Sequence, residues 1–105
     1  MRRGEVRWAE LPSPIGRRPV LLLSRDAAYR VRTSVTVAMV TRTIRNIPSE
    51  VLLEHEDGLP VKCVVNLDDI LTIPKSRLTE RITQLSPDKM TAVAKAIAFA
   101  LDLRV

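Results

Sequence analysis

The residues best suited to chemistry are arginines and one threonine hydroxyl, a combination that suits phosphate. Arg17-Arg18-Pro19 lies where a proline-rich loop meets an apolar run, and Thr41 ends a β-branched run and is followed by Arg42. Pro19 biases Arg18 toward an extended backbone, and a guanidinium binds phosphate through a planar fork of N–H donors. A Thr41 hydroxyl facing the same cleft could donate to a nonbridging phosphate oxygen. The pattern indicates a phosphate clamp, although an exposed arginine and an ordinary strand hydroxyl also fit these residues taken alone.

Other kinds of active site find little support in the residue inventory. His55 is the one histidine, so a Ser-His-Asp triad is not favoured, and its position before a turn predicts an exposed side chain. Asp68 and Asp69 are adjacent, and neighbouring side chains of a strand point to opposite faces, which disfavours a shared cation. Cys63 lies in an apolar stretch typical of a buried thiol. The sequence therefore predicts no metal site and no cofactor.

Positive charge is concentrated in one half of the chain. Residues 1–48 contain ten arginines and three acidic residues, a net +7, whereas residues 49–105 contain seven basic and nine acidic residues, a net −2. This asymmetry indicates a polyanionic partner, most simply a nucleic acid, with a solvated basic surface as an equal alternative from charge alone. The three aromatic residues are too scattered for a base-stacking platform, and Trp8 is expected in a core or an interface.

Length and composition predict one domain spanning residues 1–105, because 46% hydrophobic residues are enough for one core. No apolar run approaches the roughly 18 residues of a membrane span. The charged start, Met1 to Gly4, is unlike a secretion signal. A single cysteine excludes an intramolecular disulfide, so the reducing cytoplasm is the expected location.

Short strands are expected through the first 85 residues. Residues 5–10 alternate charged and apolar side chains, residues 19–24 are continuously apolar, and residues 34–41 are rich in β-branched side chains. Further strands are expected at 50–54, 62–67, 70–73 and 81–85, with a break at Asp68-Asp69 and a turn at Asp57-Gly58. Loops are expected at 11–16 and 42–48, and helical turns at 26–30 and 75–78.

A helix over about 87–102 is the clearest element. Ser86 suits the N-cap and Pro87 the first helical position. The expected apolar stripe consists of Met90, Val93, Ala94, Ile97 and Leu101. Short strands followed by a terminal helix favour a β-rich α+β fold, in which a small, strongly bent sheet or barrel of mostly antiparallel strands is closed by the helix.

Several runs, taken together and in order, resemble the MazF/PemK (Kid-like) toxins of bacterial toxin–antitoxin pairs. The resemblance extends from Arg3 to about Leu101. It implies an SH3-like barrel, a homodimer and metal-independent, sequence-specific cleavage of single-stranded RNA. The runs that carry it are Arg3-Gly4-Glu5-Val6, residues 16–24, residues 40–45, residues 63–70, Thr72-Ile73-Pro74 and Leu85-Ser86-Pro87.

The resemblance also implies which residues act on RNA. It assigns catalysis to Arg18, which precedes the strand-opening proline, and to Thr41. Members of one branch use an Arg-x-Asp signature as acid and base, but this sequence has Asn66-Leu67-Asp68 there, so the Arg18/Thr41 mechanism fits better and the general base stays open. The expected RNA-binding residues are Arg17, Arg42, Thr43, Arg45, Asn66 and Asp68.

Two functions therefore follow as hypotheses. The first is a toxin that cuts messenger RNA, or transfer or ribosomal RNA, by attack of the RNA 2′-hydroxyl, giving 2′,3′-cyclic phosphate and 5′-hydroxyl ends. Its expected partners are single-stranded RNA, a second copy of the chain and an antitoxin with an acidic or amphipathic C-terminal segment. The second is a non-catalytic SH3-like module that binds nucleic acid or a peptide.

Overall fold

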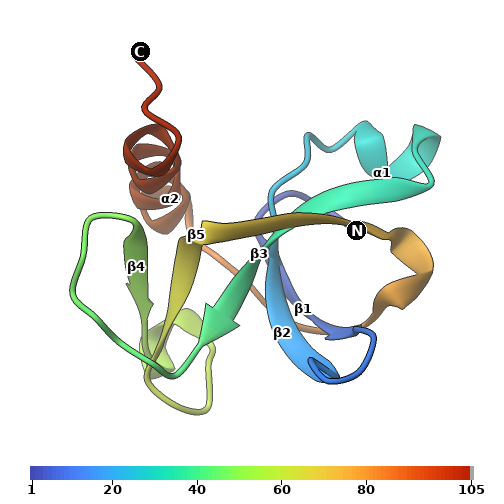
Figure 1. The fold of residues 1–105 in the computed structure, drawn as a ribbon, viewed down its shortest axis with the longest axis horizontal. Coiled ribbons are helices and arrows are strands. Elements are labelled where there is room, and N and C mark those ends of the chain that lie inside the picture. The colour runs from blue at the N-terminus through green and yellow to red at the C-terminus, as the bar shows by residue number, and fades with distance from the viewer. Residues whose placement is uncertain (105) are drawn as a thin grey trace.

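Six antiparallel strands form one sheet that curls into a half-barrel (Figure 1). The computed structural model describes residues 1–104, and the strand order is β4-β5-β3-β2-β1-β6. The C-terminal helix packs against β4 and β5, so the expected small SH3-like barrel with a terminal helix is confirmed. The elements are β1 (Glu5–Glu10), β2 (Arg17–Leu22), α1 (Ala28–Val31), β3 (Ser34–Thr41), β4 (Glu50–Leu53), β5 (Cys63–Pro74), β6 (Leu78–Gln84) and α2 (Pro87–Ala100), with single 3₁₀ turns at His55–Asp57 and Lys75–Arg77.

The curl lets both faces of the central strands bury apolar side chains. Along β2 and the residue after it, Leu21 and Leu23 enter one core while Val20 and Leu22 enter a second. Successive strand residues point to opposite faces, so a strand covered on both sides needs a continuous apolar run. This explains why residues 20–23 are apolar without alternation and are all buried.

The break expected at Asp68-Asp69 does not end a strand, so the prediction of two separate strands at 62–67 and 70–73 was wrong. β5 is continuous, and its pairing partner changes within it: Ala38 pairs with Ile70 whereas the next residue, Met39, pairs with Asn66. The intervening residues 67–69 bulge out of the ladder. A bulge bends a strand and re-aims its side chains while pairing continues on both sides.

Two other strands, β2 and β6, begin earlier than expected. β2 begins at Arg17, two residues before the expected start, because Arg17 and Arg18 pair with Glu10 and Ala9 of β1. β6 begins at Leu78 instead of residue 81, since it pairs along β1 as far as Ala9. The earlier start of β2 matters most, because it places Arg18 within a paired strand.

Helix α2 starts as expected, with the Ser86 hydroxyl accepting a hydrogen bond from the Lys89 N–H at 3.1 Å. It ends at Ala100, two residues early, and its buried face is rotated from the expected stripe. Val93 and Ala96 are buried, whereas Ala94 and Leu101 are exposed. The small Ala96 side chain belongs to the core cluster that contains β5 residues. Neither helix in residues 1–104 is long and apolar enough to cross a membrane.

A buried carboxylate connects the start of β1 to its surroundings. Glu5 accepts hydrogen bonds from the Arg7 Nε at 2.9 Å and the Arg2 N–H at 3.1 Å, and its second oxygen lies 3.7 Å from the Arg81 Nε of β6. Burial by itself would raise the pKa of Glu5, but these hydrogen bonds and the Arg7 charge outweigh it, so the pKa is lowered. The ionised form of Glu5 therefore stabilises the fold.

We expect this contribution to disappear in acid. Because the folded pKa of Glu5 lies below the 4.5 of an ordinary glutamate, its stabilisation is complete above pH 4.5 and is lost as the pH falls through the lower folded value. Glu5→Gln should reduce the free energy of unfolding by about 2 kcal/mol at pH 7, measured by urea denaturation, and the gap to the parent protein should close in acid. The exposed Glu56→Gln is the control, and a gap that is constant with pH would contradict this role.

Candidate active site

The pairing of β2 with β3 brings together the two residues expected to act on phosphate. Val20 pairs with Met39 and Leu21 with Ala38. The same antiparallel register, continued two residues toward the open end of the barrel, places Arg18 level with Thr41. Residues separated by more than twenty positions in sequence therefore meet at one end of the sheet.

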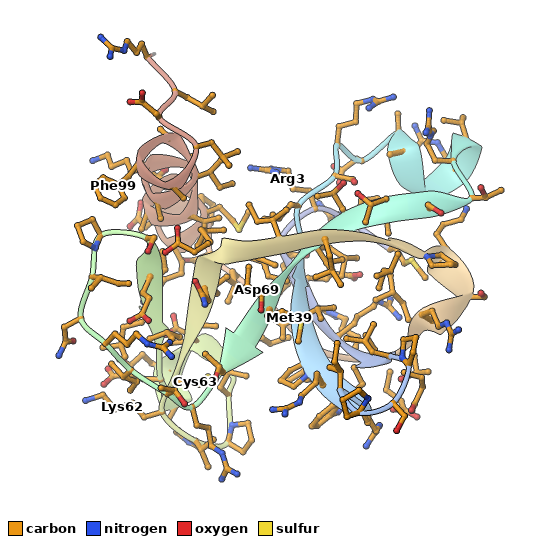
Figure 2. The ribbon with its side chains drawn as sticks, in the orientation of Figure 1. Arg3, Met39, Lys62, Cys63, Asp69 and Phe99 are labelled. Carbon is orange, nitrogen blue, oxygen red and sulfur yellow. The ribbon has the colours of Figure 1, made fainter. Side chains whose placement is uncertain are left out.

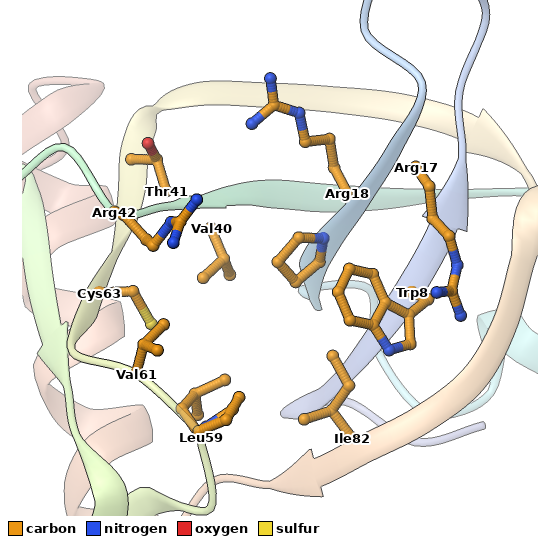
Figure 3. A pocket seen from close by; sticks show the side chains of 12 residues that line it. Trp8, Arg17, Arg18, Val40, Thr41, Arg42, Leu59, Val61, Cys63 and Ile82 are labelled. Carbon is orange, nitrogen blue, oxygen red and sulfur yellow. The ribbon is translucent and has the colours of Figure 1, made fainter.

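Two cavities open at this end. The apolar cavity, of about 460 Å³, continues the first core, and the polar cavity, of about 480 Å³, continues the second. Figure 3 shows side chains around the apolar cavity. The apolar cavity is lined by Trp8, Arg17, Arg18, Pro19, Val40, Thr41, Arg42, Leu59, Pro60, Val61, Cys63 and Ile82. The polar cavity is lined by Pro14, Ile15, Arg18, Met39, Val40, Thr41, Thr43, Arg45, Asn66, Asp69 and Leu71.

Arg18 and Thr41 line both cavities and form, with Val40, the wall between them. Figure 3 shows the Arg18 side chain extending toward Thr41, and Arg42 lies beside Thr41. The Thr41 Oγ1 accepts a hydrogen bond from the Thr43 N–H at 3.2 Å, which leaves the hydroxyl proton for donation to a ligand. Within residues 1–104, no carboxylate forms an ion pair with Arg18 or Arg42. These charges are available to an anion.

Arg17, by contrast, is held by protein groups. Its guanidinium lies 4.3 Å from the centre of the Trp8 ring, 3.3 Å from a Glu10 carboxylate oxygen and 2.6 Å from one of Glu80. The arginine therefore supports the outer side of the Trp8 ring, with its charge partly neutralised. Trp8 is half-buried and lines the apolar cavity, a site role that sequence reasoning missed. The alternating pattern of residues 5–10 predicted only a core or an interface for Trp8, and the structure adds that it pairs with Pro19 beside the cavity.

The loop after Thr41 brings Thr43 and Arg45 to the polar cavity and is held there by Glu50. The Glu50 Oε1 accepts hydrogen bonds from the backbone N–H groups of Arg45 at 2.9 Å and Asn46 at 3.1 Å. Its side chain is only 3% exposed. Asn46 has a φ of 56°, the left-handed conformation that asparagine tolerates better than most residues. A buried carboxylate thus fixes the backbone of this loop.

Asp68 and Asp69 both lie in the β5 bulge, but their side chains have different surroundings. The Asp68 carboxylate accepts a 2.5 Å hydrogen bond from the buried Ser49 hydroxyl, and the Asp68 N–H donates to the Asn66 side chain at 3.0 Å. Asp69 lines the polar cavity together with Asn66. The two carboxylates therefore have different surroundings, as expected for neighbours on a strand, and Asp69 is a cavity residue that sequence reasoning did not select.

Cys63 and His55 have the ordinary environments expected for them. Cys63 lies at the wall of the apolar cavity and is 3% exposed. Burial, together with the Asp57 charge, raises the pKa of its thiol, which disfavours the nucleophilic thiolate. His55 is exposed in a 3₁₀ turn. Across residues 1–104, no three His, Cys, Asp or Glu side chains are grouped closely enough to hold a metal ion.

The half-barrel places arginine and threonine side chains around two cavities at one end of the sheet. Residues 2–101 match the family model described as PemK-like, MazF-like toxin of type II toxin–antitoxin system, and the chain belongs to this family. It is 43% identical over 101 residues to the probable endoribonuclease MazF5 of Mycobacterium tuberculosis, covering 95% of this chain and 92% of that protein.

Solved structures agree with this assignment. The structure titled Mycobacterium tuberculosis toxin MazF-mt6 has a TM-score of 0.89 at 36% identity, covering 96% of this chain and 99% of that one. A mycobacterial endoribonuclease in complex with its cognate antitoxin has a TM-score of 0.89 at 30% identity, covering 100% and 98% of the two chains. The resemblance drawn from sequence runs is therefore confirmed.

We expect Glu50→Ala to release the loop without unfolding the sheet. Two backbone N–H groups lose their acceptor, so hydrogen exchange at Arg45 and Asn46, followed by NMR, should accelerate, and the free energy of unfolding should fall by about 1 to 3 kcal/mol. Glu50→Gln keeps one oxygen acceptor and should show a smaller effect. Unchanged exchange at both amides in Glu50→Ala would contradict this role.

Proposed function

We propose that this chain is an endoribonuclease toxin that cleaves single-stranded RNA by attack of the RNA 2′-hydroxyl on the adjacent phosphorus. The bond from phosphorus to the 5′-oxygen breaks, which gives a 2′,3′-cyclic phosphate and a 5′-hydroxyl. The observation that carries the proposal is the meeting of Arg18 and Thr41 on the wall shared by two cavities. Membership of a toxin family and the names of the relatives support it.

Stabilisation of charge is the main task of the site. As the 2′-oxygen attacks, negative charge grows on the nonbridging oxygens of the phosphorane. The positively charged Arg18 guanidinium donates to these oxygens, and the Thr41 hydroxyl donates to the same group. Such donors accelerate a reaction when they are aimed in advance at the charge that develops. Arg18 supplies the positive charge, so the proposed step uses no metal ion and no cofactor.

Proton transfer needs an acceptor for the 2′-hydroxyl hydrogen. Asp69 carries the one carboxylate among the residues that line the polar cavity with Arg18 and Thr41. We propose that the Asp69 carboxylate accepts the 2′-hydroxyl proton. A water molecule protonates the 5′-oxygen as it leaves, which gives the 5′-hydroxyl. Asp68 is not assigned this role, because its carboxylate accepts a hydrogen bond from the Ser49 hydroxyl and it lines neither cavity.

The two cavities suit an RNA strand that crosses the wall between them. Arg42 on one side and Arg45 on the other contact phosphates, Thr43 and Asn66 offer hydrogen bonds in the polar cavity, and the Trp8 ring offers a face for a base. Arg17 contributes by holding Trp8. Contacts to bases in two separate cavities are the basis of the proposed sequence specificity, and the phosphate contacts predict salt-sensitive binding.

An antitoxin and a second copy of the chain are the proposed protein partners. The complex of a mycobacterial relative with its cognate antitoxin supports the first, and an acidic or amphipathic segment would compete with RNA for the same arginines. The homodimer is supported by apolar side chains left exposed on β4 and at the end of the chain, since such surface commonly marks an interface. These are Leu52, Phe99, Leu101 and Leu103, which are 38%, 60%, 56% and 49% exposed.

Arg18→Ala should reduce RNA cleavage by about 10² to 10³-fold, and Thr41→Val should reduce it by a smaller factor. The assay uses mixed-sequence RNA in EDTA, with product ends identified by mass spectrometry. Arg104→Ala, on a side chain 89% exposed at the end of the chain, should keep full activity. Cleavage that requires a metal ion, or RNA binding without new cyclic phosphate ends, would instead favour the non-catalytic module.

Asp69→Asn should reduce the cleavage rate by about 10² to 10⁴-fold, whereas Asp68→Asn should retain most of the activity. The two variants remove the same charge one residue apart and are therefore a matched pair. Single-turnover kinetics with saturating protein separate the rate of cleavage from RNA affinity. A larger loss for Asp68→Asn than for Asp69→Asn would overturn the assignment.

A further inference from the structure

Five cations gather around α1, at a distance from both cavities. Arg25 begins the turn that leads into α1, Arg30 lies within it and Arg32 follows it. Two cations from elsewhere in the chain join them. The Lys75 Nζ donates to the Tyr29 carbonyl at 2.8 Å. The Arg3 backbone N–H donates to the Asp26 carboxylate at 2.7 Å, and the Arg3 guanidinium, labelled in Figure 2, donates to the Leu23 carbonyl just before the turn into α1. We call Arg3, Arg25, Arg30, Arg32 and Lys75 the α1 patch.

The charge of the α1 patch is largely uncompensated. Arg25, Arg30 and Arg32 are exposed, and within residues 1–104 no carboxylate lies at ion-pair distance from them. Asp26 is the acidic residue of this cluster, so the patch carries a net +4. Val31, between two of the arginines, is 71% exposed. Free guanidinium forks beside an exposed apolar side chain form a surface that attracts anions.

β3 connects the α1 patch to the active site. The strand runs from Ser34, just after α1, to Thr41 at the cavities, and Figure 1 shows α1 at the end of β3 opposite its arrowhead. Eight residues of strand span about 23 Å. Eight of the ten arginines in residues 1–48 therefore form two groups. The cavity region has Arg17, Arg18, Arg42 and Arg45, and the α1 patch has Arg3, Arg25, Arg30 and Arg32.

We propose that the α1 patch binds the phosphate backbone of single-stranded RNA beyond the cavities and is a second anchor for long RNA. The inference rests on the proposed function only for the identity of the polyanion. An RNA strand held at Thr41 that extends about 23 Å over the surface, the length of β3, would reach the patch, where each exposed arginine can contact a phosphate independently. Backbone contacts of this kind add affinity without sequence preference, so the patch favours long RNA while the cavities select the cut site.

The test compares two double variants that remove equal charge. Arg30→Gln with Arg32→Gln alters the patch, and Lys95→Gln with Arg104→Gln alters exposed cations of α2 and the chain end. Binding is measured by fluorescence anisotropy over a range of salt concentrations. The probes are 2′-O-methyl RNAs of about 30 and about four nucleotides, which lack the attacking hydroxyl and stay intact. Circular dichroism checks that each variant is folded.

The patch variant should bind the long RNA roughly tenfold more weakly near physiological salt, and its slope of log K against log salt should fall by about 1.4. The short RNA should bind it as tightly as it binds the parent protein, and the control variant should match the parent with both probes. An unchanged slope, an equal loss with the short RNA, or the same loss in the control would overturn the proposal. As a further probe, polyglutamate represents an acidic protein partner. A patch variant that binds polyglutamate more weakly than the parent protein but binds the long RNA equally well would also overturn the proposal. A parent protein that binds RNA but does not cut it would refute the proposed function and leave this result intact.

Discussion

The antiparallel register of β2 against β3 is the constraint on which the candidate site depends. With Val20 paired to Met39, Arg18 and Thr41 are level at the open end of the half-barrel. A slip of one residue would reverse the faces of every side chain on the strand. The buried side chains of β2, which enter two different cores, would then be mismatched. The hydrophobic packing that stabilises the sheet therefore also holds the arginine and the hydroxyl together.

Curling of the sheet turns this one edge into two different environments. Because both faces of β2 and β3 are covered, each face ends in its own cavity, one continuing an apolar core and the other collecting Thr43, Arg45, Asn66 and Asp69. The β5 bulge contributes by turning Asp69 to the polar cavity while Ser49 holds Asp68. In the proposed function, an RNA strand that crosses the wall would meet apolar surface on one side, suited to bases, and polar and charged groups on the other, suited to phosphates.

Much of the fold was predictable because its signals are local. β1 and β3 have the expected bounds, and the start of α2 follows from Ser86 and Pro87. The errors concern long-range pairing. Asp68-Asp69 looks like a break between strands, yet β3 pairs on both sides of it, and the buried face of α2 depends on the sheet beneath it. Trp8 and Asp69 were missed for the same reason, since a cavity is formed by elements distant in sequence.

The sequence by itself determined the charge asymmetry, the apolar runs, the strand-opening Pro19 and the family, because each is a property of residue types in order. Only the tertiary structure decided which arginines are available to a ligand. Arg17 is paired with Glu80, 63 positions away, and Arg7 with the buried Glu5. Among residues 1–104, the Arg18 side chain has a single hydrogen bond, to the Ile15 carbonyl of its own loop. The net charge of +7 in residues 1–48 does not show where the charged groups lie in the fold. Folding divides it into ion pairs, the candidate active site and a distant basic patch, because electrostatic interactions depend on distances that only the folded chain defines.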